Sequence, residues 1–259
     1  MHTAQDVRFE SVVVRYPGAD RNAVDGVSAH VPAGSFTVLL GPSGCGKSTL
    51  LRTVNRLVVP QSGDVLVGNE SVAAQIPVEL RRKIGYVIQA VGLFAHMTVA
   101  QNIAVVPSLL NWDRSRTDAR VDELLQLVGL DPARYRSRYP RELSGGEQQR
   151  VGVARAIAAE PPVLLMDEPF GAVDAIVRRS LQEEIRRIAR SLHTTILFVT
   201  HDVDEALLLA HQIVVMRDGR VEQQGTPEEL LRSPATPYVS QLFAVDPQLR
   251  RYDSLRGSV

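Results

Sequence analysis

The sequence predicts an α/β fold with a parallel sheet and a helical insertion. Residues 163–166 and 195–200 are apolar stretches of strand length, and residues 174–192 between them carry a helical pattern. Alternation of strands and helices is typical of a parallel sheet. A further apolar strand, residues 36–40, ends in a glycine-rich turn, after which a helix is expected. Residues 93–160 read as helical, which predicts the insertion.

Other elements follow from local patterns. Residues 7–15 alternate between apolar and polar side chains, as in a strand with one buried face. Within the helical segment, residues 117–130 carry apolar side chains at helical spacing, and Gly129 is placed to end that helix. Residues 213–216 and 220–224 flank an Asp-Gly turn and predict a hairpin. A last helix should then begin with a capping residue, a proline and two acids, Thr226, Pro227, Glu228 and Glu229.

The composition of the 259 residues is that of a compact globular protein, and it excludes several classes of protein and of partner. Hydrophobic residues make up 44% and charged residues 22%, values that exclude a disordered, collagen-like or coiled-coil chain. The 29 basic residues balance the 29 acidic ones, so nucleic acid is not an expected partner. The single cysteine, Cys45, cannot close an intrachain disulfide, which favours a reducing compartment.

No leader or membrane span is expected. Residues 1–10 lack the basic and apolar regions of a signal peptide. Two charge-free stretches, residues 26–46 and 84–112, contain prolines, glycines or polar side chains that are costly in lipid. The chain should therefore not cross a bilayer alone.

The first chemical motif directly follows the strand at residues 36–40. It matches the pattern GxxxxGK[ST] and consists of Gly41, Pro42, Ser43, Gly44, Cys45, Gly46, Lys47 and Ser48. The glycines let backbone amides converge on phosphates, Lys47 can reach the β- and γ-phosphates, and the Ser48 hydroxyl can bind magnesium. The alternative is an ordinary glycine-rich turn. Cys45 is expected to be only a small residue of the loop, although a thiol beside Lys47 and a helix N-terminus should have a lowered pKa and be open to alkylation.

Two carboxylates, Asp167 and Glu168, follow the strand at residues 163–166. They therefore lie at the carboxyl edge of the sheet, where open α/β sheets bind ligands. Asp167 would hold magnesium, and Glu168 could polarise the water that attacks the γ-phosphate. The alternative is a pair of solvated acids at a strand end.

A further motif opens a helix that is expected to run to Ala158, and it consists of Leu143, Ser144, Gly145, Gly146, Glu147 and Gln148. Ser144 and Glu147 have the spacing of a capping box. A cap alone does not need two glycines, whereas a bare helix N-terminus is a second anion site. Since one nucleotide cannot use both anion sites of one chain, we expect a head-to-tail dimer in which each copy completes the phosphate site of the other.

Together these motifs resemble those of the ATP-binding subunits of ABC transporters, whose signature LSGGEQ stands here as residues 143–148. The resemblance covers nearly the whole chain. It implies a P-loop NTPase core of the RecA-like type with an antiparallel β subdomain and a helical insertion. The nucleotide-binding domain should span residues 1–245, with its helical subdomain at about residues 91–160, and residues 246–259 should form a tail. ATP and Mg²⁺ are the implied ligands.

The resemblance gives roles to residues outside these motifs. Tyr16 resembles the aromatic side chain that stacks on adenine, although a packed tyrosine at a strand end is the alternative. Gln89, after a strand at residues 84–88, resembles the glutamine that links magnesium and the attacking water to the helical insertion. His201 resembles the histidine that contacts the γ-phosphate, where a lone histidine would more often be structural. Further implied nucleotide contacts are Thr49 and, from the opposite subunit, Ser144, Gly145, Gly146, Gln148 and Asp174. The residues before Asp174 read Gly-Ala-Val and lack the leucine that family members often have there.

Residues 92–112 are similar to the ATPases of importers for glycine betaine, choline, carnitine and related osmoprotectants. This implies a homodimer on the cytoplasmic face of the inner or plasma membrane, bound to integral membrane permease subunits and served indirectly by an extracytoplasmic substrate-binding protein. Leu93, Phe94 and Met97 would receive a helix of the permease, or else belong to the core of the insertion. Because the chain ends at Val259, no pair of regulatory CBS domains is expected.

Three alternatives stay open at this point. The chain could be an importer ATPase for another small solute, such as an amino acid or a sulfonate. It could be a soluble ABC ATPase outside transport, which tandem ATPase domains, coiled-coil arms or zinc modules would have favoured. It could also be a non-hydrolysing scaffold, although that class predicts the loss of Glu168 or His201, and both are present.

Overall fold

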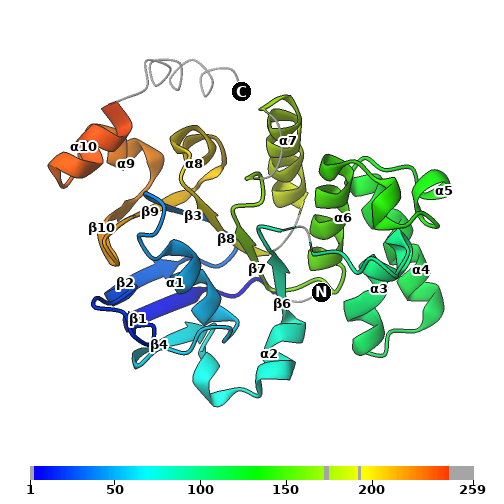
Figure 1. Cartoon of the computed structure of the whole chain (residues 1–259), viewed down its shortest axis with the longest axis horizontal. Helices are drawn as coiled ribbons and strands as arrows, with labels where there is room; N and C mark the ends of the chain where they lie inside the picture. Colours follow the sequence, from blue (N-terminus) through cyan, green and yellow to red (C-terminus); the bar gives the residue numbers. More distant parts are fainter. Residues whose placement is uncertain (1–2, 91, 172–174, 192–193, 245–259) are drawn as a thin grey trace.

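The computed structural model describes residues 3–90, 92–171, 175–191 and 194–244, and it places their strands in two sheets (Figure 1). A six-stranded sheet has the order β10-β9-β3-β8-β7-β6, and a four-stranded sheet has the order β2-β1-β4-β5. The larger sheet contains β3 Phe36–Leu40, β6 Ile84–Val87, β7 Val163–Asp167, β8 Thr195–Thr200, β9 Gln212–Arg217 and β10 Arg220–Gly225. The smaller sheet contains β1 Val7–Val14, β2 Val24–Val31, β4 Ser62–Val67 and β5 Glu70–Ser71.

The larger sheet confirms the predicted α/β fold. Its neighbouring strands pair in parallel, except for the antiparallel hairpin of β9 and β10. β3, β7 and β8 are buried along their whole length, as expected for strands that are covered on both faces. The predicted hairpin turn is present, since Asp218 and Gly219 have φ values of 48° and 80°, both in the left-handed region that a two-residue hairpin turn requires.

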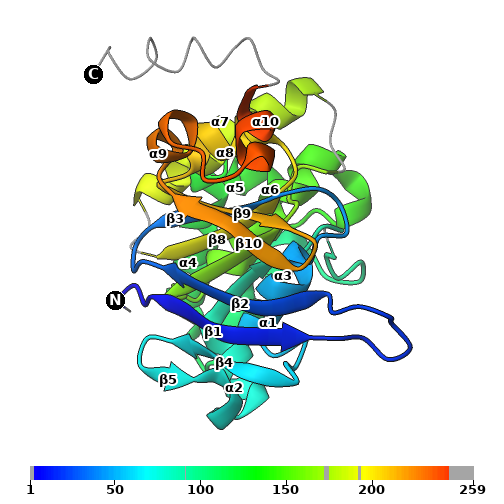
Figure 2. The same ribbon diagram turned by 90° about the vertical axis from the view of Figure 1, so that its left-hand side faces the viewer.

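The smaller sheet is antiparallel, and it packs against the first helix, α1 Lys47–Val54 (Figure 2). One core cluster joins Val7 of β1, Leu50 and Leu51 of α1, and Leu39 of β3. Side chains from both sheets therefore surround α1. Because of this packing, the loop that leads into α1 has a fixed position relative to both sheets.

The helical segment between β6 and β7 consists of α3 Val99–Leu109, α4 Arg114–Leu127, α5 Pro132–Tyr135 and α6 Gly145–Ile157. These helices lie together on the side of the molecule away from α1 (Figure 1). The helix predicted over residues 117–130 is α4, and it begins earlier because the Asp113 side chain accepts a hydrogen bond from the Arg116 backbone N–H at 2.8 Å. Gly129 follows the end of α4, as predicted.

The remaining helices are α2 Pro77–Lys83, α7 Ala175–Ser191, α8 Val203–Leu209, α9 Pro227–Arg232 and α10 Pro237–Ala244, with short 3-10 helices η1 Val72–Ala74 and η2 Pro140–Glu142. The helix that begins after Thr226 is α9, so the expectation that it is the last one was wrong. The following helix α10 buries Val239 and Phe243 one turn apart, a pattern too short to identify a helix from sequence. Within the described part of the chain, no helix is long and apolar enough to span a bilayer.

Candidate functional site

The glycine-rich motif forms the loop between β3 and α1. Gly46 precedes α1 with a left-handed φ of 104°, and a Cβ at this position would overlap the Ala23 carbonyl oxygen. A Cβ on Gly41 would likewise overlap the Met216 carbonyl oxygen. The close approach of backbone therefore requires glycine at both positions. The bare loop at the start of a helix is a suitable binding site for phosphate groups.

Lys47, the first residue of α1, places a positive charge inside this loop. It is 4% exposed, and its Nζ donates hydrogen bonds to the carbonyl oxygens of Gly41 at 2.7 Å and Pro42 at 2.8 Å. Burial of a charge is costly unless the charge is hydrogen-bonded, so these carbonyls fix the position of the ammonium group. The loop thereby combines backbone amides and a cation, the arrangement that binds nucleotide phosphates.

Ser48 and Asp167, two of the three residues predicted at the magnesium site with Gln89, contact each other directly. The Ser48 hydroxyl donates to Asp167 Oδ1 at 2.6 Å, and Asp167 is 1% exposed. Its other oxygen accepts hydrogen bonds from Arg52 at 2.9 Å and from the Tyr86 hydroxyl at 3.3 Å. A hydroxyl and a carboxylate are hard oxygen donors, and Mg²⁺ commonly uses only one or two protein ligands beside phosphate. This pair therefore fits a magnesium ion.

Sequence reasoning missed Arg52 and Tyr86. Arg52 follows Ser48 by four residues on α1, a spacing that places both side chains on one helix face, so a signal for Arg52 was present. Tyr86 reaches Asp167 because β6 pairs with β7, with Tyr86 opposite Leu165. That pairing joins segments far apart in sequence, and no local pattern reveals it.

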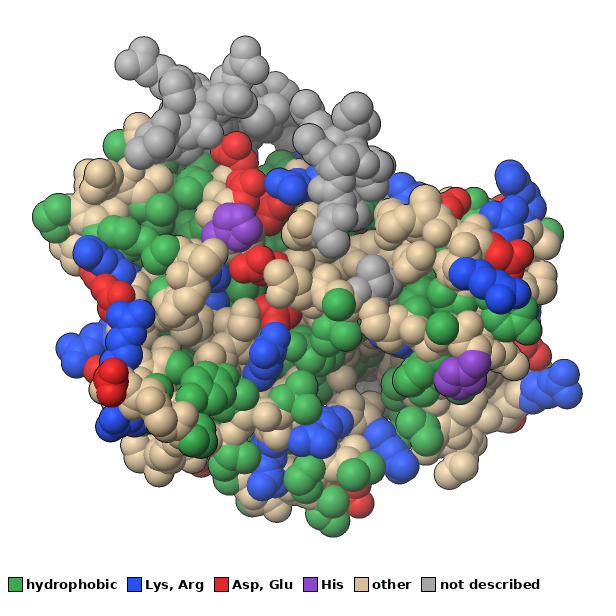
Figure 3. Space-filling view, in the orientation of Figure 1, with side chains coloured by type: hydrophobic (Ala, Val, Ile, Leu, Met, Phe, Trp, Pro, Cys, Tyr) green, Lys and Arg blue, Asp and Glu red, His purple; other side chains and the backbone are tan. Residues whose placement is uncertain are grey.

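Glu168, Gln89 and His201 lie close together, although they come from three different segments of the chain. The Gln89 amide donates to Glu168 Oε2 at 3.4 Å, and His201 Nδ1 lies 3.6 Å from Glu168 Oε1. They follow β7, β6 and β8, which are neighbours in the sheet. The Glu168 side chain is 19% exposed and that of His201 is 58% exposed. Figure 3 shows acidic side chains and a histidine gathered where β8 and α8 meet in Figure 1.

The backbone of Glu168 has an unusual conformation. Its φ is 43°, in the left-handed region that is uncommon outside glycine, and its N–H donates to the Val199 carbonyl oxygen at 3.1 Å. Such residues are found preferentially at functional sites. A shielded carboxylate in this position can accept a proton from a water molecule at the end of the sheet.

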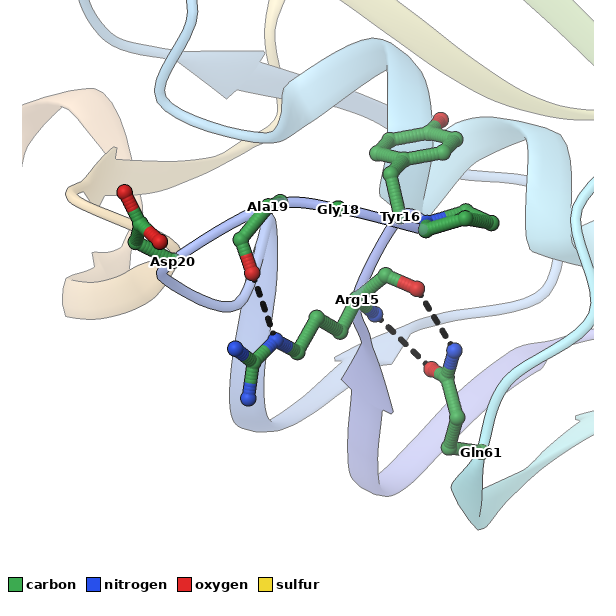
Figure 4. A pocket seen from close by; sticks show the side chains of 7 residues that line it. Arg15, Tyr16, Gly18, Ala19, Asp20 and Gln61 are labelled. Carbon is green, nitrogen blue, oxygen red and sulfur yellow. Dashed lines mark hydrogen bonds between the residues drawn. The ribbon is translucent and has the colours of Figure 1, made fainter.

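Tyr16 is at the end of β1, beside α1. The residue is 44% exposed, and its hydroxyl oxygen lies 3.2 Å from the Thr49 hydroxyl oxygen. Figure 4 shows the ring on one side of the chain and Arg15 with Gln61 on the other, where Gln61 bonds the backbone of Arg15. The surface hollow at this place is lined by Arg15, Tyr16, Pro17, Gly18, Ala19, Asp20 and Gln61. An aromatic ring exposed to this extent can stack on a base.

The LSGGEQ motif forms the capped start of α6, as predicted. The Ser144 side chain accepts from the Glu147 N–H, and Glu147 Oε2 accepts from the Ser144 N–H at 2.8 Å. Hydrogen bonds from the Tyr135 hydroxyl and then from the Ser144 backbone lower the pKa of Glu147. Gly145 has open space where a Cβ would lie. The Gln148 amide is turned inward and donates to the carbonyl oxygens of Pro140 and Leu143 at 3.1 and 3.2 Å.

The start of α6 and the phosphate loop are separate within one chain. α6 packs with α3 and α4, whereas α1 packs with the smaller sheet (Figure 1). Ser144 and Gly145 are exposed, and Gly146 and Gln148 are half-buried. Asp174, the other residue predicted to contact an opposite subunit, lies outside the described residues.

Cys45 differs from the sequence expectation. The residue is 5% exposed, and burial raises the pKa of the thiol, outweighing the opposing effects of Lys47. The Lys47 ammonium bonds to loop carbonyls and lies 3.9 Å from the Cys45 sulfur. The predicted lowered pKa and open access to alkylation were therefore wrong.

We expect Cys45 to react slowly with iodoacetamide in the folded protein. Thiolate is the reactive form, and a raised pKa keeps the thiol protonated at neutral pH while burial hinders access. Labelling at neutral pH, followed by mass spectrometry, should be at least about tenfold slower than in the same protein unfolded in urea. Equal rates in the two states would contradict the buried position of this thiol.

Known proteins give independent information. Residues 24–171 match the family described as ABC transporter. The chain is 52% identical over 237 residues to the glycine betaine/carnitine/choline transport ATP-binding protein of Bacillus subtilis (strain 168). The matched region covers 92% of this chain and 62% of that protein. It is 53% identical over 223 residues to a glycine betaine uptake system ATP-binding protein of Escherichia coli (strain K12), covering 86% of this chain and 72% of that protein.

The fold is also similar to that of a solved structure, a dimeric ATP-binding cassette in a post-hydrolysis state bound to ADP and Pi. The TM-score is 0.75 at 30% sequence identity, and the match covers 85% of this chain and 98% of that one. The chain thus matches nearly all of a single cassette, while it spans less than two thirds of the length of the Bacillus subtilis relative.

Proposed function

Because this chain belongs to the ABC transporter family, we propose that it is the ATP-hydrolysing subunit of an importer. The observation that carries this proposal is the meeting of two groups of side chains at the ends of β6, β7 and β8. Ser48 lies 2.6 Å from Asp167, and Glu168 lies within 3.4 Å of Gln89 and 3.6 Å of His201. A phosphate loop, a pair of magnesium ligands and a shielded base are the parts that phosphoryl transfer to water requires.

The residues of this site divide the work of ATP hydrolysis. The loop amides and Lys47 bind the phosphates, and Tyr16 supports the adenine ring. When bound, Mg²⁺ would neutralise charge on the β- and γ-phosphates, held by Ser48 and Asp167 with Gln89 beside them. Glu168 accepts a proton from the water that attacks the γ-phosphate.

Gln89 and His201 orient the two oxygens of Glu168, one from each side. His201, with its side chain more than half exposed, is also free to contact the γ-phosphate. This division of roles explains why a carboxylate and a histidine lie together at the edge of a buried sheet.

We propose a homodimer in which the start of α6 of one copy faces the phosphate loop of the other. Ser144 and Gly145 are exposed at the start of α6, which packs with α3 and α4, and this supports a role across an interface. The similarity to a dimeric cassette bound to ADP and Pi favours the same arrangement. Asp174 would join this contact. Closure on two ATP molecules and reopening after hydrolysis would then drive movement of the partners.

We propose quaternary amines such as glycine betaine, choline and carnitine as the cargo, on the strength of the names of the two relatives. The partners would be integral membrane permease subunits, with an extracytoplasmic substrate-binding protein acting through them. The subunit would be bound to the cytoplasmic face of the membrane. Residues 1–245 would form the nucleotide-binding domain with its helical subdomain at about residues 91–160, and residues 246–259 a tail.

Uptake of labelled glycine betaine, choline and carnitine tests this proposal in source cells that lack the subunit. Wild-type protein should restore uptake and Glu168→Gln should not, whereas Glu79→Gln, a change at an exposed residue of α2, should restore it fully. Uptake that never depends on the subunit would overturn the assigned cargo. Dependence of amino acid or sulfonate uptake in the same cells would move the subunit to another class of importer.

A further inference from the structure

Glu205 is a buried carboxyl group four residues after the proposed catalytic histidine in the sequence, and none of the roles above includes it. It lies on α8, is 5% exposed, and is close in sequence to His201. Glutamate is almost never fully buried unless it is paired. A carboxyl group kept in this position therefore needs an explanation from its contacts.

Both oxygens of Glu205 accept hydrogen bonds. The Thr200 hydroxyl donates to Oε2 at 2.6 Å, and the Gln182 amide donates to Oε1 at 3.1 Å. Burial raises the pKa of Glu205, while the hydrogen bond from Thr200 lowers it. Glu205 thus connects the end of β8 to α7, two elements that flank the site.

Thr200 connects Glu205 to the backbone around His201, because its hydroxyl group takes part in hydrogen bonds with both. Its hydroxyl oxygen accepts a hydrogen bond from the Asp202 N–H at 3.0 Å, on the far side of His201. The Asp202 side chain in turn caps α8 by accepting from the N–H groups of Asp204 and Glu205 at 2.9 and 3.1 Å. The turn that carries His201 is therefore fixed at both ends, by Thr200 before it and by the capped helix after it.

We infer that Glu205 is a positioning residue that acts through Thr200 to hold His201 beside Glu168, and that Gln182 ties this placement to α7. The inference rests on the proposed ATPase function. His201 Nδ1 lies 3.6 Å from Glu168 Oε1, so a small shift of the turn changes this contact directly. Since α7 begins directly after Asp174 in sequence, the network links the histidine to the element that follows a predicted dimer contact.

Thr200→Val tests the inference, with Thr194→Val as the matched control. Both threonines are buried, at 3% and 6% exposure, and each hydroxyl donates one hydrogen bond: that of Thr194 goes to the Pro161 carbonyl oxygen at 2.9 Å, away from His201. We expect the two variants to lower the melting temperature of the protein by similar amounts. Only Thr200→Val should lower kcat for ATP hydrolysis, on the order of 10-fold to 100-fold, because a displacement of about 1 Å costs that much in a positioned site. KM for ATP should stay within about twofold of wild type, since the histidine turn does not form the phosphate loop.

Two variants of Glu205 separate positioning from simple stability. Glu205→Gln keeps the shape of the side chain and an oxygen that accepts the hydrogen bond from Thr200. Its new amide N–H can donate to Gln182 once the Gln182 amide has flipped its oxygen toward it, so kcat should stay near that of wild type. Glu205→Ala should lower kcat as Thr200→Val does. The double variant Thr200→Val with Glu205→Ala should be no slower than the slower single variant, as expected for residues that act as one unit.

Wild type and Glu168→Gln in the same assay keep the two proposals distinct. If wild type itself does not hydrolyse ATP, the proposed function fails, whereas full activity of Glu168→Gln would remove only the role of Glu168 as base. If Glu168→Gln is inactive but Thr200→Val has the kcat of Thr194→Val, the ATPase function holds and the role of Glu205 is overturned.

Discussion

Glu168→Gln should abolish steady-state ATP hydrolysis while leaving ATP binding intact. The amide keeps the shape of the side chain and can still contact Gln89 and His201, but it cannot accept a proton from water. A general base contributes roughly 10²-fold to 10⁴-fold to such a reaction, so phosphate release should fall by that factor. Because the dimer is proposed to reopen after hydrolysis, this variant should also accumulate as an ATP-bound dimer.

Phosphate release and size-exclusion chromatography with ATP measure the two effects together. Glu79→Gln is the control, since it makes the same chemical change at an exposed position of α2. It should hydrolyse ATP like wild type and show no persistent dimer. Near wild-type turnover by Glu168→Gln would remove Glu168 from the role of base and leave the carboxylate without a catalytic assignment.

Gly46→Ala should weaken ATP binding by roughly 100-fold, because the added methyl group cannot fit. Its Cβ would overlap the Ala23 carbonyl oxygen, which is backbone and cannot rotate away, so the loop must move. A displacement of about 1 Å misaligns the amides that face the phosphates, and we expect it to lower the affinity for ATP by about 100-fold. Titration with a fluorescent ATP analogue gives the affinity, and thermal unfolding monitored by circular dichroism shows that the variant is folded.

Gly44→Ala is the matched control in the same loop. Gly44 also has a left-handed φ, 78°, but apart from its two chain neighbours no described residue has an atom within 4 Å of the Cβ that would be added. Gly44→Ala should therefore add only backbone strain, which lowers the free energy of unfolding by about 1 to 2 kcal/mol. The affinity for ATP should change by less than about tenfold. Equal affinities for the two alanine variants would show that the contact with Ala23 does not position the loop.

Much of the site could be predicted from short motifs because their chemistry is local. Successive backbone amides, a lysine and a hydroxyl are brought together by the loop and the first turn of α1, whatever the rest of the chain does. The capping box of Ser144 and Glu147 is local in the same sense, and the structure confirms it. Those parts of the fold that depend on a helical or alternating pattern, such as α4 and β1, were predicted for the same reason.

The parts that were missed or wrong depend on distant segments. Arg52 and Tyr86 converge on Asp167 from positions 115 and 81 residues away. Cys45 was misjudged because its side chain lies in a core cluster with Leu39, Leu50 and Met216, so residues outside the loop help to bury the thiol. The Glu205 network joins α7, β8 and α8, and no spacing within any one of them reveals it.

Short segments of the sequence predicted a loop for phosphates, a strand that ends in two carboxylates, and a second helix start for anions. How these parts meet depends on the fold of the whole chain. The order β8-β7-β6 places Glu168 between His201 and Gln89, two residues that are far apart in the chain. Motifs can be recognised in the sequence because the backbone geometry that they require involves only a few consecutive residues. Strand order is set by packing of the whole core, so the surroundings of each motif residue emerge only when the chain is folded.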